Sequence, residues 1–375
     1  MLRLTSVTSY RESQRLLCDF WHRKEADAPR LRTMADLVKR IGQQLCSHAQ
    51  GFAAETLSHN GFSEATGLPL SDSQLSASIK QASRAAIEGT VMLEAWKRAD
   101  AALRPGAPCP IPSKGDMEVP EMSCYVSVDD VGVKHQKEHR KGAAAKSGKY
   151  VENTVAKVQA DGKEYLLTGI GMEQTFRLLL AFLLHNHLLE ERHLIFFTDG
   201  ARNIRNNIEG MFGFHPFRII LDWYHLKKKC QEHLSMAMRG SKVRNDTLER
   251  LLPLLWCGNV EAARSYLQGL ERSLVKNAQW IEKLDAYLCK NQPFIPCYAV
   301  RRELGLRNSS SPVEKANDLL VAQRQKHNGM SWSKDGSGAL AAIRMMFLNG
   351  EERAWMARHK LSFALHTPLE GNKCA

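Results

Sequence analysis

The chain has 375 residues, of which 43% are hydrophobic and 25% charged, and its formal net charge is +12. This composition is typical of a globular protein of two or three domains. The longest apolar stretch, residues 178–189, is too short to span a bilayer, and no signal peptide is visible, which excludes a transmembrane protein and predicts a cytoplasmic one. The positive charge predicts a polyanionic partner, nucleic acid first. The nine cysteines include no CxxC pair, which argues against a zinc ribbon or a disulfide framework.

Residues 1–104 are predicted to be helical. Apolar residues keep helical spacing between Met34 and Leu45, and a second helix is expected from Ser71 or Ser73 to about Ala102. The segment between these helices contains Gly67 and fits a DNA-binding helix-turn-helix. A plain helical hairpin is the preferred interpretation of the same pattern, and the DNA-binding one stays open.

Residues 105–120 are predicted to be a linker. Four prolines fall within residues 105–112, and proline lacks the amide N–H that helices and central strands need.

The next segment, residues 121–225, changes to a pattern of strands. Strands are expected at 125–133, 154–159 and 164–170, the last two flanking an Asp161-Gly162 turn, which is a strong type I′ hairpin signal. A helix is then expected at 173–189, a strand ending at Asp199, a helix at 201–211 and a fifth strand at 218–221. This order predicts an α/β fold with an RNase H-like mixed five-stranded sheet, in which three antiparallel strands are extended by two parallel ones and flanked by helices.

No further strand is expected after the fifth one. Residues 226–305 are predicted to form an all-helical insertion, with a capping box at 246–249. Residues 306–375 are predicted to complete the core with helices, the first of which begins at Ser311.

Acidic residues at the strand ends are the main candidates for chemistry. Asp129 lies in a strand, where an unpaired charge is costly to bury, so we expect it to face a cation or solvent. Asp130 points to the opposite face of the same strand. We prefer Asp129 because the apolar pattern ends on it, and an exposed strand end is the alternative.

Two more carboxylates complete the candidate set. Asp199 follows an apolar strand, and parallel strands place functional groups at their carboxyl ends, although a turn Asp is the simpler alternative. Glu314 lies in the first turn of a helix, where it could instead form a capping box with Ser311. If Asp129, Asp199 and Glu314 converge, they can bind two hard cations that catalyse in-line attack on a phosphodiester.

Asp222 and His225 follow the fifth strand directly. We expect them to be hydrogen-bonded partners that hold the end of this strand beside the acidic site. The alternative is an ordinary cap between a strand and a helix.

Basic and aromatic residues near these acids are candidates for contact with DNA. Residues 134–149 hold six Lys or Arg against one acid, a pattern that fits phosphate contacts or a solvated loop. The candidate DNA-binding residues are Lys134, Lys137, Arg140, Lys141, Lys227, Lys228, Arg324, Lys326 and Trp332. Trp332 could stack on a base or belong to the core.

From about Tyr125 to Trp355 the chain resembles bacterial insertion-sequence DDE transposases, those with an RNase H-like core interrupted by a long helical insertion. The resemblance rests on residues 126–132, 197–201, 221–225 and 311–317, followed by 324–326 and 329–333. In that family the first Asp, the Asp before Gly and the Glu after the insertion are the metal ligands. The resemblance therefore implies that role for Asp129, Asp199 and Glu314, with Asp222, His225 and Asp130 in support.

The same resemblance implies the activity and the partners. We expect Mg²⁺, with Mn²⁺ as a substitute, to support cleavage and strand transfer of double-stranded DNA at terminal inverted repeats and at a target. A homo-oligomer on DNA, and a bacterial cytoplasmic protein that joins the nucleoid when bound to DNA, are also implied. The rival hypotheses are a non-catalytic DNA-binding derivative and an RNase H-like nuclease that cuts without joining.

Overall fold

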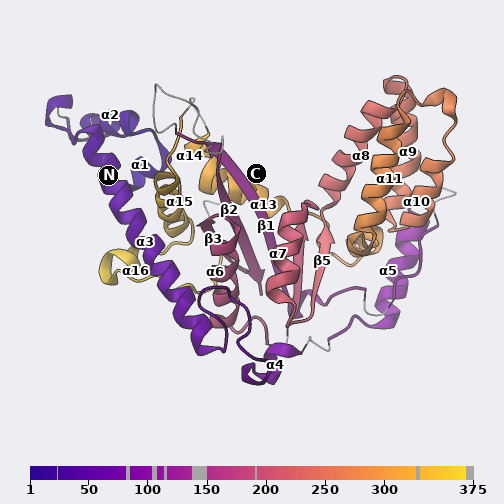
Figure 1. Cartoon of the computed structure of the whole chain (residues 1–375), viewed down its shortest axis with the longest axis horizontal. Helices are drawn as coiled ribbons and strands as arrows, with labels where there is room; N and C mark the ends of the chain where they lie inside the picture. The colour runs from indigo at the N-terminus through magenta and orange to yellow at the C-terminus, as the bar shows by residue number, and fades with distance from the viewer. Residues whose placement is uncertain are drawn as a thin grey trace.

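A central β-sheet separates two groups of helices in the computed structural model (Figure 1). The structure describes residues 1–22, 24–81, 85–103, 108–113, 116–136, 150–190, 192–326 and 330–368. The long N-terminal helix lies along one side of the molecule, and the helices of the insertion rise on the other side, beyond the last strand (Figure 1). The sheet therefore lies between segments that are far apart in the sequence.

The sheet has five strands in the order β3-β2-β1-β4-β5. Their bounds are β1 Ser123–Lys134, β2 Tyr150–Ala160, β3 Lys163–Ile170, β4 His193–Thr198 and β5 Phe217–Leu221. β2 pairs antiparallel with both β1 and β3, whereas β4 pairs parallel with both β1 and β5. This is the RNase H-like topology, and it confirms the predicted fold class. The β2–β3 turn has the positive φ values of a type I′ hairpin, 50° at Asp161 and 70° at Gly162.

Helices between and after the strands cover the sheet. They are α6 Met172–His185, α7 Arg202–Phe212, α13 Ser311–Asn317, α14 Gln323–Gln325, α15 Lys334–Leu348 and α16 Glu352–Arg358. A π-helical turn, Asp318–Ala322, joins α13 to α14. α6 and α15 pack against β2 and β3, and α13 packs against β1 and β2, so the helix that carries Glu314 lies beside the strand that carries Asp129.

The insertion forms its own apolar core against the parallel half of the sheet. Its helices are α8 Trp223–Ala237, α9 Ser241–Trp256, α10 Val260–Gln268, α11 Ala278–Asn291 and α12 Tyr298–Glu303. Leu226, Leu251 and Leu284 share one buried cluster with Phe197 of β4 and Ile220 of β5. Residues 246–249 lie inside α9, so the capping box predicted there is wrong: Thr247 is buried and its hydroxyl donates to the Val243 carbonyl within the helix.

The N-terminal helices divide between the two sides of the molecule. They are α1 Leu2–Val7, α2 Tyr10–Trp21, α3 Leu31–His59, α4 Ala77–Lys80 and α5 Gly89–Ala101. α3, which includes the predicted helix at residues 34–45, packs on α6 and α15, whereas α5 packs on α12 of the insertion. The described residues of 1–104 therefore do not form one separate unit.

The second helix predicted from Ser71 to about Ala102 is formed only in its last part, as α5 Gly89–Ala101, which packs on α12 of the insertion. Within the described residues, neither the helix-turn-helix nor the plain hairpin with α3 is formed. A bridge between Phe62 and Pro69 is followed by a single 3-10 turn and the four-residue α4. The hydroxyls of Ser71 and Ser73 hydrogen-bond to each other at 3.1 Å, and serine side chains with such local partners compete with helix formation.

The described part of the predicted linker has neither helix nor strand, but it is fixed to the protein. Trp96 Nε1 donates to the Cys109 carbonyl at 2.8 Å, and Cys109 is buried beside Ala299 and Val300 of α12. Within the described ranges, no helix is long and apolar enough to cross a membrane.

Candidate active site

Three aspartates, Asp129, Asp199 and Asp222, line the edge of the sheet where the parallel strands end. Ser127 of β1 pairs with Phe197 of β4. Asp129 and Asp199 each lie two residues beyond this pair, so the same register places them next to each other. On the other side of β4, the Asp222 amide donates to the Thr198 carbonyl at 2.9 Å. The edge of this sheet therefore gathers carboxylates from three strands, as open α/β sheets do at their carboxyl ends.

Asp129 and Asp130 face different neighbours. Asp129 Oδ2 accepts a hydrogen bond from Asn317 Nδ2 on α13, and Asp129 Oδ1 accepts from the Asp130 amide at 2.8 Å. Asp130 instead accepts from the Thr154 hydroxyl of β2 and from Asn203 Nδ2 of α7. Because α13 also carries Glu314, the Asp129 carboxylate points toward the helix of a second candidate ligand, whereas Asp130 contacts β2 and α7.

The pKa values of both carboxyls are raised. The pKa of Asp129 is raised to about 6, mainly by burial and also by the negative charges of Asp199 and Asp130, while the hydrogen bond from the Asp130 amide and the His225 side chain oppose the rise. Burial also raises the pKa of Asp130, opposed by its hydrogen bond from Thr154. A carboxylate whose pKa is raised by neighbouring negative charges marks a place where a cation is favoured.

Asp129→Asn is expected to stabilise the cation-free protein near pH 7. Since the pKa of Asp129 is about 6 when folded and about 3.8 as an isolated group, the folded chain holds more protons between these values. The stability that this group contributes therefore falls as pH rises through that window, on the order of 3 kcal/mol in total. Urea unfolding with a chelator should show the variant more stable at pH 7.5, with the difference shrinking toward pH 4.

Asp246→Asn, which changes an exposed carboxylate on α9, is the matched control and should show no such pH-dependent gain. Equal stability of Asp129→Asn and the unaltered protein at pH 7.5 would contradict the assignment.

Asp199 ends β4 in a tight turn. Its Oδ1 accepts from the Ala201 amide at 2.7 Å, so the turn role considered from the sequence is present alongside its place beside Asp129. Gly200 has a φ of +87°, and a Cβ there would lie 2.9 Å from Leu221 Cδ1 and 3.1 Å from Tyr287 Oη. Only glycine fits this turn, and Tyr287 brings helix α11 of the insertion against it.

Glu314 and His225 form the pair that faces the strand acids from the helical side. Glu314 Oε1 lies 2.8 Å from His225 Nε2. The capping box expected between Glu314 and Ser311 is wrong, because the Ser311 amide donates to the Ser309 hydroxyl at 3.0 Å. Glu314 is thus held by an imidazole from α8 and remains 44% exposed.

The Asp222 carboxylate accepts hydrogen bonds from two backbone amides and not from the imidazole of His225. Its Oδ1 accepts from the His225 amide at 2.8 Å, and its Oδ2 accepts from the Ser310 amide. The expected Asp222–His225 side-chain pair is therefore corrected to a helix cap that also clamps the segment before α13. Asp222 is 1% exposed, so this clamp is part of the core.

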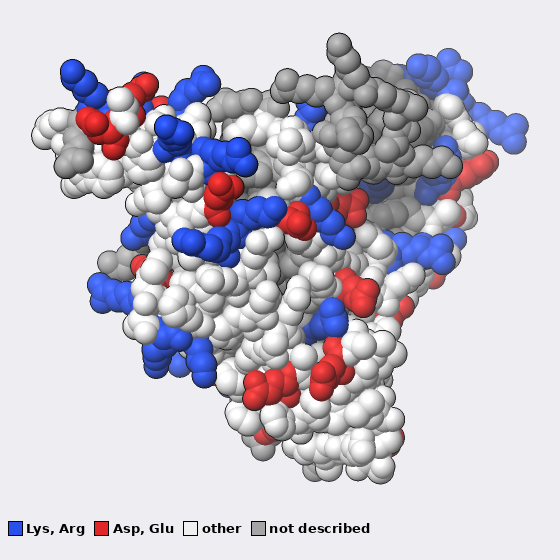
Figure 2. Space-filling model, turned by 60° about the vertical axis from the view of Figure 1, so that its left-hand side comes forward, with Lys and Arg blue, Asp and Glu red and all other residues white. Residues whose placement is uncertain are grey.

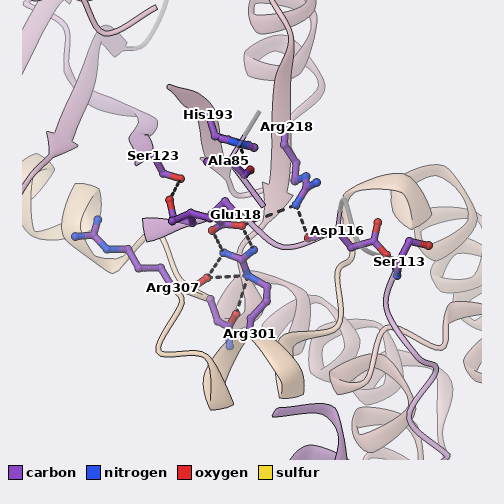
Figure 3. Close-up of polar contacts among 11 residues, drawn as sticks. Ala85, Ser113, Asp116, Glu118, Ser123, His193, Arg218, Arg301 and Arg307 are labelled. Carbon is purple, nitrogen blue, oxygen red and sulfur yellow. Dashed lines mark hydrogen bonds and ion pairs between the residues drawn. The ribbon is translucent and has the colours of Figure 1, made fainter. Parts of the chain in front are cut away.

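A buried ion pair supports the same segment from behind. Arg301 of α12 binds both carboxylate oxygens of Glu118 at 2.6 Å, and both side chains are fully buried. The guanidinium also donates to the Arg307 carbonyl and to Asn308 Oδ1, and the Asn308 carbonyl accepts from the Trp223 amide. Figure 3 shows Glu118 and Arg301 facing each other where the chain enters β1, with Arg218 beside the carboxylate.

Hard oxygen donors suit Mg²⁺, and Asp129, Asp199 and Glu314 supply them. Among the residues that the structure describes, the buried Asn317 Oδ1 has no hydrogen-bond partner. Within the described part of the chain, however, no group of three or more His, Cys, Asp or Glu is placed to hold a metal ion as it stands. The donor chemistry of these carboxylates fits a hard cation, whereas Glu314 is engaged with His225 in this structure.

The predicted DNA-binding residues separate into three groups. Lys134, Lys227, Lys228 and Lys326 are exposed. Lys137, Arg140 and Lys141 lie outside the described residues. Arg324 and Trp332 are only 2% and 9% exposed, so their assignment to DNA contact is corrected.

Arg324 and Trp332 instead attach the N-terminus to the core. Arg324 Nε donates to the Thr5 carbonyl at 3.1 Å, and its guanidinium lies 5.2 Å from the ring centroids of both Tyr10 and Trp332. Trp332 Nε1 donates to the Gln325 carbonyl at 3.0 Å. Their polar atoms are thus used within the protein.

The positive charge is uneven along the chain. Residues 226–305 contain fourteen Lys and Arg against eight Asp and Glu, so the insertion carries +6 of the total of +12. On the face that Figure 2 shows, Lys and Arg are scattered among acidic side chains with broad uncharged areas between them.

Sequence reasoning missed the residues that position the acids. Asn317 was detectable as the residue three positions after Glu314, a spacing that places both on one helix face. Tyr287 and Arg301 approach the site from the insertion and left no local signal.

Comparisons with protein-family models, with curated proteins and with solved structures gave no match for this chain. The fold and the site together define an RNase H-like α/β protein with an acidic cluster at the carboxyl edge of its parallel strands.

Proposed function

We propose that this protein is a DDE-type transposase, which cleaves DNA and transfers strands at the ends of an insertion sequence. The observation that carries the proposal is the placement of Asp129 level with Asp199, with Glu314 on the adjoining helix α13. The RNase H-like sheet and the net charge of +12 support the same conclusion.

Each residue has a role in this proposal. Asp129 and Asp199 would provide the fixed oxygen donors. Glu314 would provide a third, after its carboxylate leaves His225 and turns toward the cation. Bound divalent cations, Mg²⁺ or Mn²⁺, supply activation of the attacking hydroxyl and stabilisation of the leaving oxygen. His225 orients Glu314, and the Asp222 clamp holds the start of α13. Exposed Lys227 and Lys228, on the same helix as His225, are placed to meet phosphates.

Asp199→Asn tests the proposal. The reaction contains a plasmid that carries the coding sequence with its native flanking DNA, and Mg²⁺. We expect the unaltered protein to cut at the flanks and join the ends to a second plasmid. The variant should lose at least about a hundredfold in both steps, because even residues outside a ligand shell reduce metal-site activity by 10- to 100-fold. Gel analysis and sequencing of the junctions measure cleavage and joining.

Asp246→Asn is the matched control, since it removes an exposed carboxylate on α9 and should retain full activity. Full strand transfer by Asp199→Asn would refute the ligand set. Cleavage without joining would identify a nuclease, and DNA binding without cleavage would identify a non-catalytic derivative.

A further inference from the structure

Asn317 is the one residue of the site with a buried polar atom that lacks a partner. The residue is 6% exposed, and its Oδ1 is buried with no hydrogen bond among the described residues. A buried carbonyl oxygen without a partner is destabilising unless something else binds it. Its Nδ2, by contrast, donates to Asp129 Oδ2.

Reversing the amide does not remove the problem. With oxygen and nitrogen exchanged, Oδ1 would face the Asp129 carboxylate, two acceptors in contact, and the amide N–H₂ would occupy the position without an acceptor. In either orientation, therefore, one of the two polar groups of the carboxamide lacks a hydrogen-bond partner among the described residues.

The backbone at this residue is also unusual. Asn317 ends α13, and the chain continues directly into the π-helical turn Asp318–Ala322. Such turns are rare and frequently accompany functional sites. Glu314 precedes Asn317 by three residues, so the two side chains share a face of α13.

We propose that Asn317 is a further residue of the cation site and that its Oδ1 binds a hydrated divalent cation held by Asp129. The inference rests on the proposed function, because it adds a residue to the same site. Carboxamide oxygen is a hard donor of the kind that divalent cations prefer. In the cation-free protein the Nδ2 hydrogen bond keeps the Asp129 carboxylate turned toward α13, so Asn317 serves as a positioning residue before the cation arrives.

Binding of Mn²⁺ to the full-length protein without DNA tests the proposal, measured by electron paramagnetic resonance titration of free Mn²⁺. Asn317→Leu keeps the approximate shape and removes both polar groups. We expect its Mn²⁺ affinity to fall about tenfold. Its melting temperature with a chelator should change little, since removal of the unpaired oxygen is offset by loss of the Nδ2 hydrogen bond to Asp129.

Asn203→Leu is the matched control. Asn203 donates to the neighbouring carboxylate Asp130 at 3.4 Å, so the same substitution there removes an amide beside the site without touching Asp129. Its Mn²⁺ affinity should equal that of the unaltered protein.

Asn317→Asp is the second variant, for the case in which Asn317→Leu does not fold. An added carboxylate beside Asp129 should lower the melting temperature without cation and enlarge the rise that Mn²⁺ produces. Equal Mn²⁺ affinity of Asn317→Leu and the unaltered protein would overturn the role of Asn317 alone. An unchanged Mn²⁺-induced rise in Asn317→Asp would do the same. Absence of Mn²⁺ binding by the unaltered protein would overturn both this inference and the proposed function.

Discussion

Arg301→Met is expected to lower the free energy of unfolding by about 3–5 kcal/mol, since it leaves the buried charge of Glu118 without its main partner. Glu118 and Arg301 are both fully buried and bind through two hydrogen bonds of 2.6 Å. Arg218, whose Nη1 lies 3.8 Å from Glu118 and whose side chain is 32% exposed, compensates only in part. Urea unfolding followed by circular dichroism measures the loss.

The double variant Glu118→Leu/Arg301→Met is the control that isolates the unpaired charge. Replacing both members of a buried ion pair with apolar residues is often neutral or stabilising, so the double variant should recover much of the stability lost by Arg301→Met. If Arg301→Met lowers the free energy of unfolding by less than about 1 kcal/mol, the buried pair contributes no more than an exposed ion pair, and the prediction is wrong.

Asp222→Ala is expected to cost about 2–4 kcal/mol of stability. The substitution removes the cap of α8, worth about 1 kcal/mol. It also leaves the buried Ser310 amide without an acceptor, which costs about 1–3 kcal/mol more. Because the Asp222 carboxylate joins the start of α8 to the segment before α13, the substitution should also separate His225 from Glu314.

Urea unfolding measures the stability loss. Nuclear magnetic resonance of the His225 ring reports the contact with Glu314. Asp246→Ala, on the exposed side of α9, is the control and should stay within about 0.5 kcal/mol of the unaltered protein. A His225 ring signal unchanged in Asp222→Ala would show that Glu314 is positioned without the Asp222 clamp.

The sheet was predictable because its signals are local. The Asp161-Gly162 turn defined one hairpin, and the apolar runs that end at Asp199 and Leu221 defined the parallel strands. Once the strand order was known, the sheet topology followed from the rules for connections. The same reasoning placed Asp129 and Asp199 at one edge, since parallel strands end together.

The contacts that orient the site were not predictable, because they join residues distant in the sequence. Arg301 meets Glu118 across 183 residues, and Asn317 meets Asp129 across 188. Arg324 and Trp332 were misassigned for the same reason, since a cation and an indole near a basic segment suggest contact with DNA. In the structure the Arg324 guanidinium lies over the Trp332 ring and donates to the Thr5 carbonyl of α1. The helix predicted to begin near Ser71 begins only at Gly89, and the hydroxyls of Ser71 and Ser73 bind each other instead of capping a helix.

The close crossing of α3 and α15 limits where the chain can be shortened or fused to another domain. A Cβ on Gly42 would lie 2.3–2.5 Å from backbone and side-chain atoms of Ala339, so the two helices touch almost backbone to backbone. α3 is thus part of the core that surrounds the sheet, and a fragment that starts after residue 60 would leave the apolar faces of α6 and α15 uncovered. An added domain therefore has to be fused ahead of α1, because replacing the N-terminal helices would remove part of the core around the sheet.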